Sequence, residues 1–504
     1  MVGNAGIARS QGEGQSRGIT VWVGTAEPQS GHNPMPSLPA LLLLLATSLG
    51  AQNLRLPSLF SEGAVLQAGD TPVFGKAAPG SSVQVTLGDA TATARADGNG
   101  AWRATLKGLR PSDTGRELVV VASSGESREE FRALDVIVGE VWIGSGQSNM
   151  DWTLSRIVPA DELRAFPADP TLRWFRVAAT PSAEPAADIR GKWIKAAPET
   201  APHISAVAYF FGNRLRAELR QPVGLIVTSI GGTRAEAWGP RGMYDGIAGA
   251  EGWQEREDKA VAARAGKNDP RNPPVWSNGP HMNWNGMVHP FVGYGIRGAL
   301  WYQGESNAGD AKAYDWVLGG MIRAWHKAWG SDFPFLIVQL PRFGSGNEQW
   351  PPLRAQQEKV AATVTGAMMT VNIDLGEEKD IHPRDKKPVG QRLALLALER
   401  VYGKPIVGTS PTPLRFVAAG GGLTVTFDRP VRLVNGGKGF EMLGKDGAWL
   451  SATAETKGST LTLRCVGAAS PPRARYAWKS WPEWSLVSAG EDRLPVGPWM
   501  SPGK

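Results

Sequence analysis

A chain of 504 residues, 42% hydrophobic and 20% charged, has the composition of a folded globular protein rather than a disordered one. Its length indicates roughly three domains. The 54 Lys and Arg against 47 Asp and Glu give a formal net charge of +7, but no basic run marks a nucleic-acid partner. The single cysteine, Cys465, excludes an internal disulfide and a cysteine metal cluster. No apolar run reaches the roughly 18 residues of a membrane span.

The N-terminal region is predicted to be a leader. Residues 1–34 are rich in Gly, Ser and Gln and lack periodicity, which indicates a disordered leader or a start codon assigned too far upstream. Residues 35–51 follow with an apolar stretch and then small residues, the pattern of a secretory signal peptide cleaved near Ala51. No Lys or Arg precedes the apolar stretch after Met35, and a buried helix is the alternative. The pattern predicts a secreted or periplasmic protein.

Two regions have the pattern of short β-strands. In residues 54–135, alternating stretches such as VQVTLG and ELVVVAS are separated by the turn sequences PGSS, DGNG and PSDTG. We expect an antiparallel β-sandwich there. The same pattern returns in residues 408–504, for example in GLTVTFDRPVRLV, and predicts a second small β module.

Residues 136–407 alternate between buried-strand and helix patterns. VIVGEVWIGSG, PVGLIVTSIGG, GIRGALWYQGES and FPFLIVQLP are apolar runs typical of parallel strands buried on both faces. AVAYFFGNRLRAEL and VGQRLALLALERVYG have apolar residues at helical spacing. The alternation predicts a layered α/β domain with a parallel sheet, in which ligands lie at the carboxyl ends of the strands.

Two glycine-rich turns follow predicted strands. GSGQSNM exposes the Ser148 hydroxyl and a backbone N–H, which are the two requirements of a serine nucleophile and its oxyanion hole. The second glycine of a G-x-S-x-G elbow is absent. In IGGT, Gly231 and Gly232 expose N–H groups that can also donate to an oxyanion. Each turn alone is equally well explained as an ordinary tight turn.

Two polar segments follow later strands. WYQGESN contains Asn307, an amide donor, and Glu305, a carboxylate that can orient loops. DIHP contains His382, a candidate general base, with the Asp380 carboxylate close enough in sequence to set its tautomer. Taken singly, such residues more often satisfy backbone groups or lie on the surface.

The four segments together, in the order Ser, Gly, Asn, His, resemble the SGNH hydrolase superfamily. More closely the chain resembles the sialate O-acetylesterase family of carbohydrate esterases. The stretches that carry the resemblance are VWIGSGQSNM, AVAYFFGNRL, PVGLIVTSIGGTRAEAW, GIRGALWYQGESNA and DIHPRDKKPVGQRLA, and the resemblance covers most of residues 54–500. It implies a three-layer α/β/α catalytic domain with a parallel sheet, flanked by small β modules.

The resemblance also implies residue roles. Ser148 becomes acetylated, His382 takes and returns its proton, and Asp380 orients His382. The remaining roles are the oxyanion hole, made by the N–H groups of Ser148 and Gly232 and the Asn307 amide, and substrate binding by Gln147, Gln303 and Glu305. No cofactor is implied.

One position departs from the superfamily pattern. The aspartate expected three residues before the histidine is Lys379 here, so Asp374 or Glu378 could replace Asp380, or the site could work as a Ser-His dyad. We expect His281 and His289 to be pocket or structural residues. The Asp and His residues between 374 and 385 do not indicate a metal site, because the cations of that loop oppose a divalent ion: Lys379, Arg384, Lys386 and Lys387.

The substrate expected from the resemblance is an O-acetylated sugar, with O-acetylated sialic acid first and acetylated xylan or another polysaccharide as the alternative. A non-catalytic carbohydrate-binding protein is the competing hypothesis, but a decayed site should have lost Ser148, Asn307 or His382, and all are present. A lipid ester or thioester substrate would favour apolar loops. The polar loop GWQEREDKAVAARAGKNDPRNPP suits a sugar better.

Overall fold

The computed structural model describes residues 53–265, 273–344, 348–419 and 421–502. The predicted leader, residues 1–34, and the predicted signal peptide, residues 35–51, lie outside the described residues. Among the helices of the described part, none combines the length and the apolar character needed to cross a bilayer.

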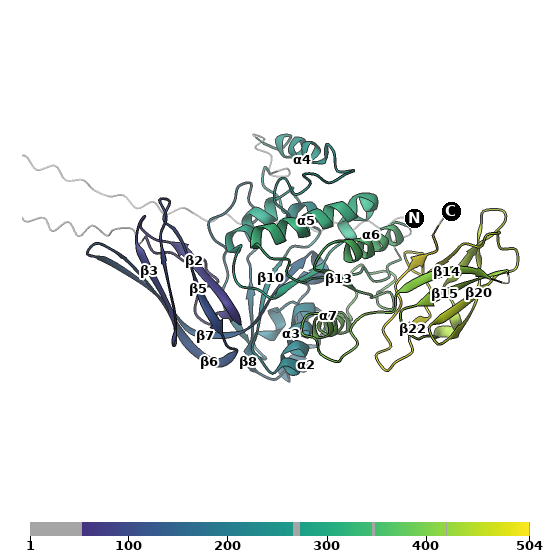
Figure 1. The fold of residues 1–504 in the computed structure, drawn as a ribbon, viewed down its shortest axis with the longest axis horizontal. Helices are drawn as coiled ribbons and strands as arrows, with labels where there is room; N and C mark the ends of the chain where they lie inside the picture. Colours follow the sequence, from purple (N-terminus) through teal and green to yellow (C-terminus); the bar gives the residue numbers. More distant parts are fainter. Residues whose placement is uncertain (1–52, 266–272, 345–347, 420, 503–504) are drawn as a thin grey trace, which may run out of the picture. The chain divides into compact units, whose positions relative to one another are not determined.

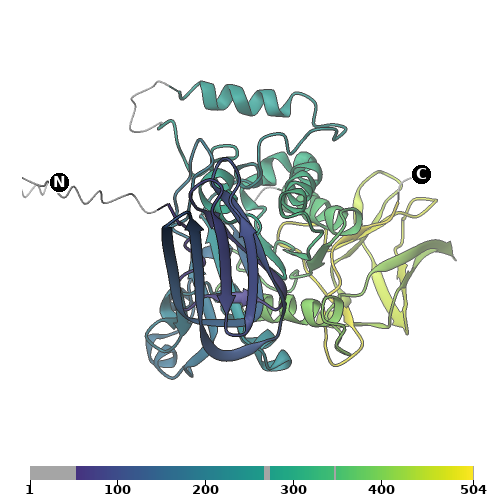
Figure 2. The same ribbon diagram turned by 60° about the vertical axis from the view of Figure 1, so that its left-hand side comes forward.

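The N-terminal strands are antiparallel and form two facing sheets, drawn in purple and dark blue in Figure 2. Strand β2 (Gly69–Lys76) pairs with β5 (Ala101–Leu109). The second sheet contains β3 (Ser82–Leu87), β4 (Ala90–Arg95), β6 (Ser112–Ser124) and the first half of β7 (Ser127–Gly146). Apolar residues alternate along these strands, so one face of each sheet is buried.

Strand β7 continues without a break into the central sheet. The boundary predicted between residues 135 and 136 therefore falls inside a 20-residue strand. Asp135 has a φ of 55° at this point, and Arg173 donates to its backbone oxygen at 2.6 Å and to its carboxylate at 3.0 Å. Beyond Asp135, the short strand β1 (Val65–Gln67) pairs with β7 in parallel. One strand thus belongs to both the sandwich and the central sheet.

The central sheet has the strand order β13-β12-β11-β7-β10-β8-β9. All neighbours are parallel except β8 and β9, which are antiparallel. The remaining strands are β8 (Asp169–Arg176), β9 (Trp193–Ala196), β10 (Val223–Ser229), β11 (Gly298–Tyr302), β12 (Phe335–Val338) and β13 (Ala367–Thr370).

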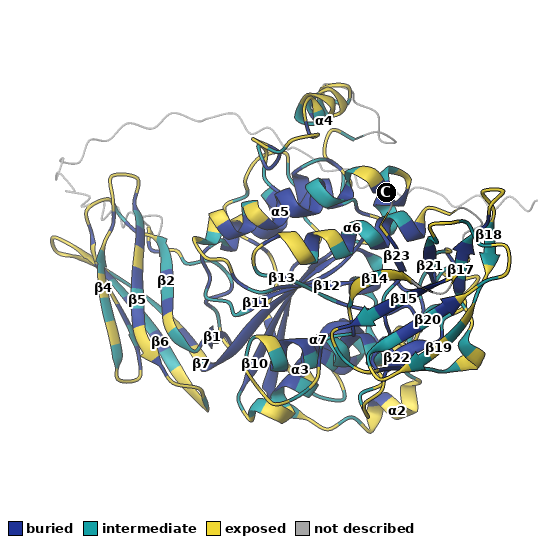
Figure 3. Ribbon diagram, turned by 45° about the vertical axis from the view of Figure 1, so that its right-hand side comes forward, coloured by how far each residue is buried: buried dark blue, intermediate teal, exposed yellow. Residues whose placement is uncertain are grey.

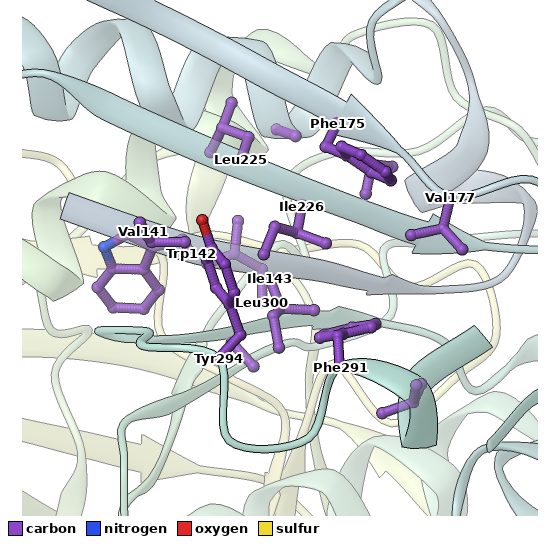
Figure 4. Close-up of a cluster of buried hydrophobic side chains, with 14 of the residues drawn as sticks. Val141, Trp142, Ile143, Phe175, Val177, Leu225, Ile226, Phe291, Tyr294 and Leu300 are labelled. Carbon is purple, nitrogen blue, oxygen red and sulfur yellow. The ribbon is translucent and has the colours of Figure 1, made fainter. Parts of the chain in front are cut away.

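Helices cover both faces of this sheet. Helices α5 (Tyr314–Trp329) and α6 (Trp350–Thr363) lie on one face, and α3 (Ala206–Leu219) and α7 (Lys387–Arg400) on the other (Figures 1 and 3). The short helices are α1 (Ser148–Asp151), α2 (Ala160–Arg164) and α4 (Trp253–Ala262). This arrangement confirms the predicted three-layer α/β/α fold. The core between the layers contains Val141, Ile143, Phe175, Leu225, Ile226 and Leu300, all almost fully buried (Figure 4).

Helix α3 spans the predicted residues 206–219 without a difference. Ser205 caps it by accepting the N–H of Ala208, and Arg220 ends it in the left-handed conformation, with a φ of 54°. Gly390 of α7 packs so closely on α3 that a Cβ there would lie 2.7 Å from the Val207 oxygen. The close approach fixes α7, and with it the loop that contains His382.

The C-terminal strands form small antiparallel sheets with a core of their own. This core includes Val371 and Ile373, which follow β13, so it is continuous with the central layer. Arg354 of α6 is fully buried and donates to the backbone oxygens of Lys479 and Ser480. The strands are β14 (Pro413–Ala419), β15 (Gly422–Phe427), β16 (Val431–Leu433), β17 (Phe440–Leu443), β18 (Trp449–Ser451), β19 (Thr453–Lys457), β20 (Thr460–Arg464), β21 (Ala474–Tyr476), β22 (Leu486–Ser488) and β23 (Trp499–Met500).

Candidate active site

The parallel register of three neighbouring strands brings the predicted motifs to one edge of the sheet. Strand β7 lies between β10 and β11, and Ser145 pairs with Thr228 on one side and with Trp301 on the other. The serine, glycine and asparagine motifs follow the carboxyl ends of these strands. The Gln147 N–H donates to the Tyr302 oxygen at 3.0 Å, which joins the first motif to the third.

Ser148 and His382 form a hydrogen-bonded pair. Ser148 begins helix α1, and its Oγ lies 2.9 Å from Nε2 of His382. On the other side of the ring, Oδ1 of Asp380 lies 3.5 Å from Nδ1 and also accepts the His382 backbone N–H at 2.8 Å. A hydroxyl, an imidazole and a carboxylate therefore follow one another in a chain of contacts, which is the arrangement that can activate a hydroxyl.

The surroundings of His382 favour its neutral form over the imidazolium. Burial lowers its pKa below the ordinary value of 6.5, and the positive charges of Lys386 and Arg156 act in the same direction. Asp380 opposes them and raises the pKa. The ring of Trp152 stacks on the imidazole, with the centroids 4.8 Å apart and the planes 14° from parallel. A neutral imidazole can accept the Ser148 proton at neutral pH.

The alternatives to Asp380 differ in their surroundings. Asp374 forms a two-pronged ion pair with Arg392, with N–O distances of 2.7 Å and 2.5 Å. The carboxylate of Asp374 is thus engaged by a guanidinium. The Oδ1 atom of Asp380 lies 3.5 Å from Nδ1 of His382, and the Asp380 side chain is 48% exposed.

Gly231 and Gly232 lie beside the serine. A Cβ on Gly231 would be 3.4 Å from the Cβ of Ser148. Gly232 has a φ of 73°, which favours glycine, and a Cβ there would meet no described atom within 4 Å. Among the described residues, the N–H groups of Ser148 and Gly232 have no hydrogen-bond acceptor. Both are free to donate to an oxyanion.

Asn307 is anchored behind the glycine turn. Its Oδ1 accepts the Ala235 N–H at 3.0 Å and the Gln303 amide at 2.7 Å, and its Nδ2 donates to Glu236 at 2.8 Å. An amide nitrogen carries two hydrogens, so one N–H of Asn307 remains for the site. Arg234 in turn binds Glu236 and holds it in place. The asparagine is therefore rigidly oriented.

Gln303 corrects one expectation. The residue is fully buried, its Nε2 donates to the Thr233 oxygen and to Asn307, and its Oε1 accepts the Tyr314 hydroxyl at 2.7 Å. An enclosed side chain with its amide engaged on both sides cannot contact a sugar. Gln303 holds Asn307, and its expected role in substrate binding is wrong.

The other two predicted substrate residues contact the segments next to Ser148. Gln147 is 3% exposed, and its Oε1 accepts the Ser306 N–H at 3.3 Å. Glu305 accepts from Asn149 at 2.5 Å, while its second oxygen is buried and has no hydrogen-bond partner among the described residues. Burial raises the pKa of Glu305. Both side chains support the turns around Ser148.

Three neighbours of Ser148 and His382 are absent from the sequence-based prediction: Trp152, Asn149 and Arg156. The Cζ of Arg156 lies 5.5 Å from the centroid of the Trp152 ring. The spacing of Asn149 and Trp152 from Ser148, at one and four residues, is the available signal. Sequence alone cannot show that these side chains turn toward the histidine loop.

The remaining histidines have other surroundings. The ring of His281 is buried, with Nδ1 at 2.8 Å from the Gly239 oxygen and Nε2 at 3.2 Å from Glu257. His281 is thus a structural residue. His289 is exposed and its ring contacts Trp284. Within the described part of the chain, no three His, Cys, Asp or Glu side chains converge as a metal site.

The comparisons with known proteins agree on one family. A family model described as carbohydrate esterase, sialic acid-specific acetylesterase, matches residues 276–399. The sialate O-acetylesterases of Mus musculus and Homo sapiens are each 29% identical to the chain. The alignments cover 93% of the chain and 98% of the mouse protein, and 88% of the chain and 90% of the human protein.

A solved structure gives the same result in three dimensions. The crystal structure of a carbohydrate acetylesterase from Xanthomonas citri superposes with a TM-score of 0.77 at 32% identity. The match covers 89% of this chain and 99% of that protein, so it includes the β modules as well as the central layer. The chain belongs to the sialate O-acetylesterase family of carbohydrate esterases.

Proposed function

We propose that this esterase removes O-acetyl groups from carbohydrates through an acetyl-enzyme formed on Ser148. The observation that carries the proposal is the 2.9 Å contact between the Ser148 hydroxyl and Nε2 of His382, with the Asp380 carboxylate at the opposite ring nitrogen. The match to a carbohydrate acetylesterase over 89% of the chain supports the reaction class.

The reaction follows from these positions. His382 takes the Ser148 proton while Oγ bonds to the acetyl carbon, and the carbonyl oxygen becomes an oxyanion. The Ser148 and Gly232 N–H groups and the free N–H of Asn307 donate to this oxygen. The C–O bond to the sugar then breaks, and His382 returns the proton to the leaving hydroxyl. Water, deprotonated by His382, then bonds to the acetyl carbon, the bond between that carbon and Oγ of Ser148 breaks, and His382 returns the proton to Oγ as acetate leaves.

O-acetylated sialic acid is the substrate we propose first. The family model and the mammalian relatives carry that sugar in their names. The surface around the histidine supports an anionic sugar, because the guanidinium of Arg156 is exposed and, among described residues, makes no ion pair. A carboxylate is the natural partner of such a group. Since the Xanthomonas citri relative is named only for carbohydrate, acetylated xylan is the alternative to test.

We also propose that the protein is exported, on the signal-peptide pattern of residues 35–51. The first residue of the mature protein, read by N-terminal sequencing after expression of the full chain, tests this. A mature N-terminus close to residue 52 supports export. A protein that stays in the cytoplasm and retains Met35 contradicts it.

The deciding experiment is acetate release from a panel of O-acetylated sialic acids and acetylated xylan oligosaccharides, with the wild type beside Ser148→Ala. We expect release that depends on Ser148, and faster turnover of the sialic acids. Undiminished release by folded Ser148→Ala would contradict the acetyl-enzyme. Release confined to xylan would change the substrate and leave the mechanism intact.

A further inference from the structure

Lys386 is a buried cation next to the catalytic pair. It ends the loop that contains His382, directly before helix α7, and is fully enclosed. Its ammonium donates a hydrogen bond to Oδ1 of Asn149. The same nitrogen lies 5.5 Å from the ring centroid of Trp152 and 5.3 Å from that of Tyr302. Burial of an ammonium is costly unless its charge has partners, so this position calls for a specific explanation.

Asn149 connects the lysine to both members of the catalytic pair. It follows Ser148 in helix α1, so its backbone is continuous with the nucleophile. Its Nδ2 donates to the Ile381 oxygen at 3.0 Å, and Ile381 directly precedes His382. The same amide donates to Glu305 at 2.5 Å. One asparagine thus joins the serine helix, the histidine loop and the third motif, and Lys386 fixes which way its amide faces.

Lys386 and His382 each have charged neighbours. Burial lowers the pKa of Lys386 to about 7, and its acidic neighbours oppose this, with Glu305 first and Glu377, Asp380 and Asp385 after it. The imidazole of His382 is faced by Asp380, which favours its protonated form, and by Lys386 and Arg156, which disfavour it. Of these two cations, Lys386 is buried and held by a hydrogen bond, whereas Arg156 is exposed.

We propose that Lys386 is a positioning residue of the esterase reaction. Through Asn149 its ammonium holds the His382 loop against the Ser148 helix. At the acidic pH values where the imidazole titrates, Lys386 is protonated and places a positive charge near the ring. The inference rests on the proposed function, because it assigns Lys386 to the support of the same serine and histidine. A positive charge at this place disfavours the imidazolium and so keeps the base ready to accept a proton.

The test is the pH dependence of kcat/KM for p-nitrophenyl acetate in four lysine variants. Lys386→Met removes both the charge and the hydrogen bond, Lys386→Gln removes the charge and keeps a donor, and Lys386→Arg keeps the charge. The acid limb is the range in which kcat/KM falls as the pH decreases. We expect this limb to move to higher pH in the Met and Gln variants. For Lys386→Met we also expect kcat/KM at the plateau to fall roughly 10²-fold, because His382 is displaced. Lys386→Arg should keep the wild-type limb. Lys387→Met, an exposed neighbour, is the matched control and should change nothing.

The results distinguish a positioning role of Lys386 from a role in folding alone. An acid limb at the wild-type pH in folded Lys386→Met and Lys386→Gln overturns the proposal, as does failure of both neutral variants to fold, since Lys386 would then be a structural residue. Ser148→Ala, measured in the same series, distinguishes failure of the proposed function from failure of the role given to Lys386. If Ser148→Ala is active, the proposed function fails; if it is inactive while the Lys386 variants behave as wild type, only the present inference fails.

Discussion

The imidazole of His382 lies flat against the indole of Trp152, with the ring centroids 4.8 Å apart and the planes inclined by 14°. The indole covers one face of the ring, while Ser148 and Asp380 lie at its two nitrogens. This cover contributes to the burial that lowers the His382 pKa. We therefore expect the position of Trp152 to influence the pH dependence of activity.

The wild-type pH profile follows from that pKa. Because His382 must be neutral to accept the Ser148 proton, activity rises as the pH increases through the His382 pKa. Since burial lowers the His382 pKa below 6.5, we expect the acid limb of kcat/KM for an acetyl ester to have its midpoint below pH 6.5. The measurement is a profile from pH 4.5 to 8, a range chosen to bracket the ordinary histidine pKa of roughly 6.5. A midpoint above 6.5 would contradict the direction of the shift.

Replacement of Trp152 tests the cover directly. In Trp152→Ala the imidazole gains water on one face, so its pKa should rise and the acid limb should move to higher pH. We expect a loss of roughly tenfold in kcat/KM, a part of the contribution of a general base. Trp152→Phe keeps a stacked ring and serves as the control. If the limb stays in place in Trp152→Ala, burial by the indole does not set the pKa.

Asp380 is expected to matter less than His382. Its side chain is 48% exposed and its Oδ1 lies 3.5 Å from Nδ1, so water screens its effect on the ring. His382→Ala should lose at least roughly 10³-fold in kcat, and Asp380→Asn about tenfold to a hundredfold. Steady-state rates of acetate release compare the two. Equal losses would make Asp380 a full member of a triad.

Arg156 is the residue on which sugar selectivity should depend. Arg156→Gln removes an exposed cation near His382, which should raise KM for O-acetylated sialic acid roughly tenfold and leave acetylated xylan oligosaccharides unchanged. Arg110→Gln, an exposed arginine of the N-terminal module, is the control. A KM that rises equally for the neutral sugar would show that Arg156 does not recognise the carboxylate.

The strand and helix pattern was sufficient to predict the layered fold. Residues 206–219 are α3 as predicted, because alternation of buried strands with helical periodicity is a local signal. Strand β8 and helix α5 were not predicted. Helix α5 is clearly amphipathic, with Val317, Leu318, Met321, Ile322 and Trp325 buried, so its apolar stripe was an available signal that the prediction did not use. The sequence could not reveal that the sandwich and the central sheet share strand β7. A strand that passes from one domain to the next has no turn sequence at the boundary.

The site was predictable where backbone geometry determines it. A serine, two glycines and an asparagine after parallel strands must meet at one sheet edge, and Ser148 and His382 are in contact. The direction of each side chain was not predictable. Gln303 turns inward to hold Asn307, and Lys386, one of four cations in a polar loop, is enclosed. Such choices depend on packing between segments more than 70 residues apart in the sequence, such as Asn307 and Ala235.

Through strand β7 the N-terminal module can support the site without binding a sugar itself, because it holds this strand in register. Side chains alternate along a strand, so a slip of one residue would send every core-facing side chain of β7 to the opposite face. The antiparallel ladder between β6 and the first half of β7 resists such a slip from outside the catalytic layer. The sandwich thus fixes the register of the strand that ends two residues before Ser148.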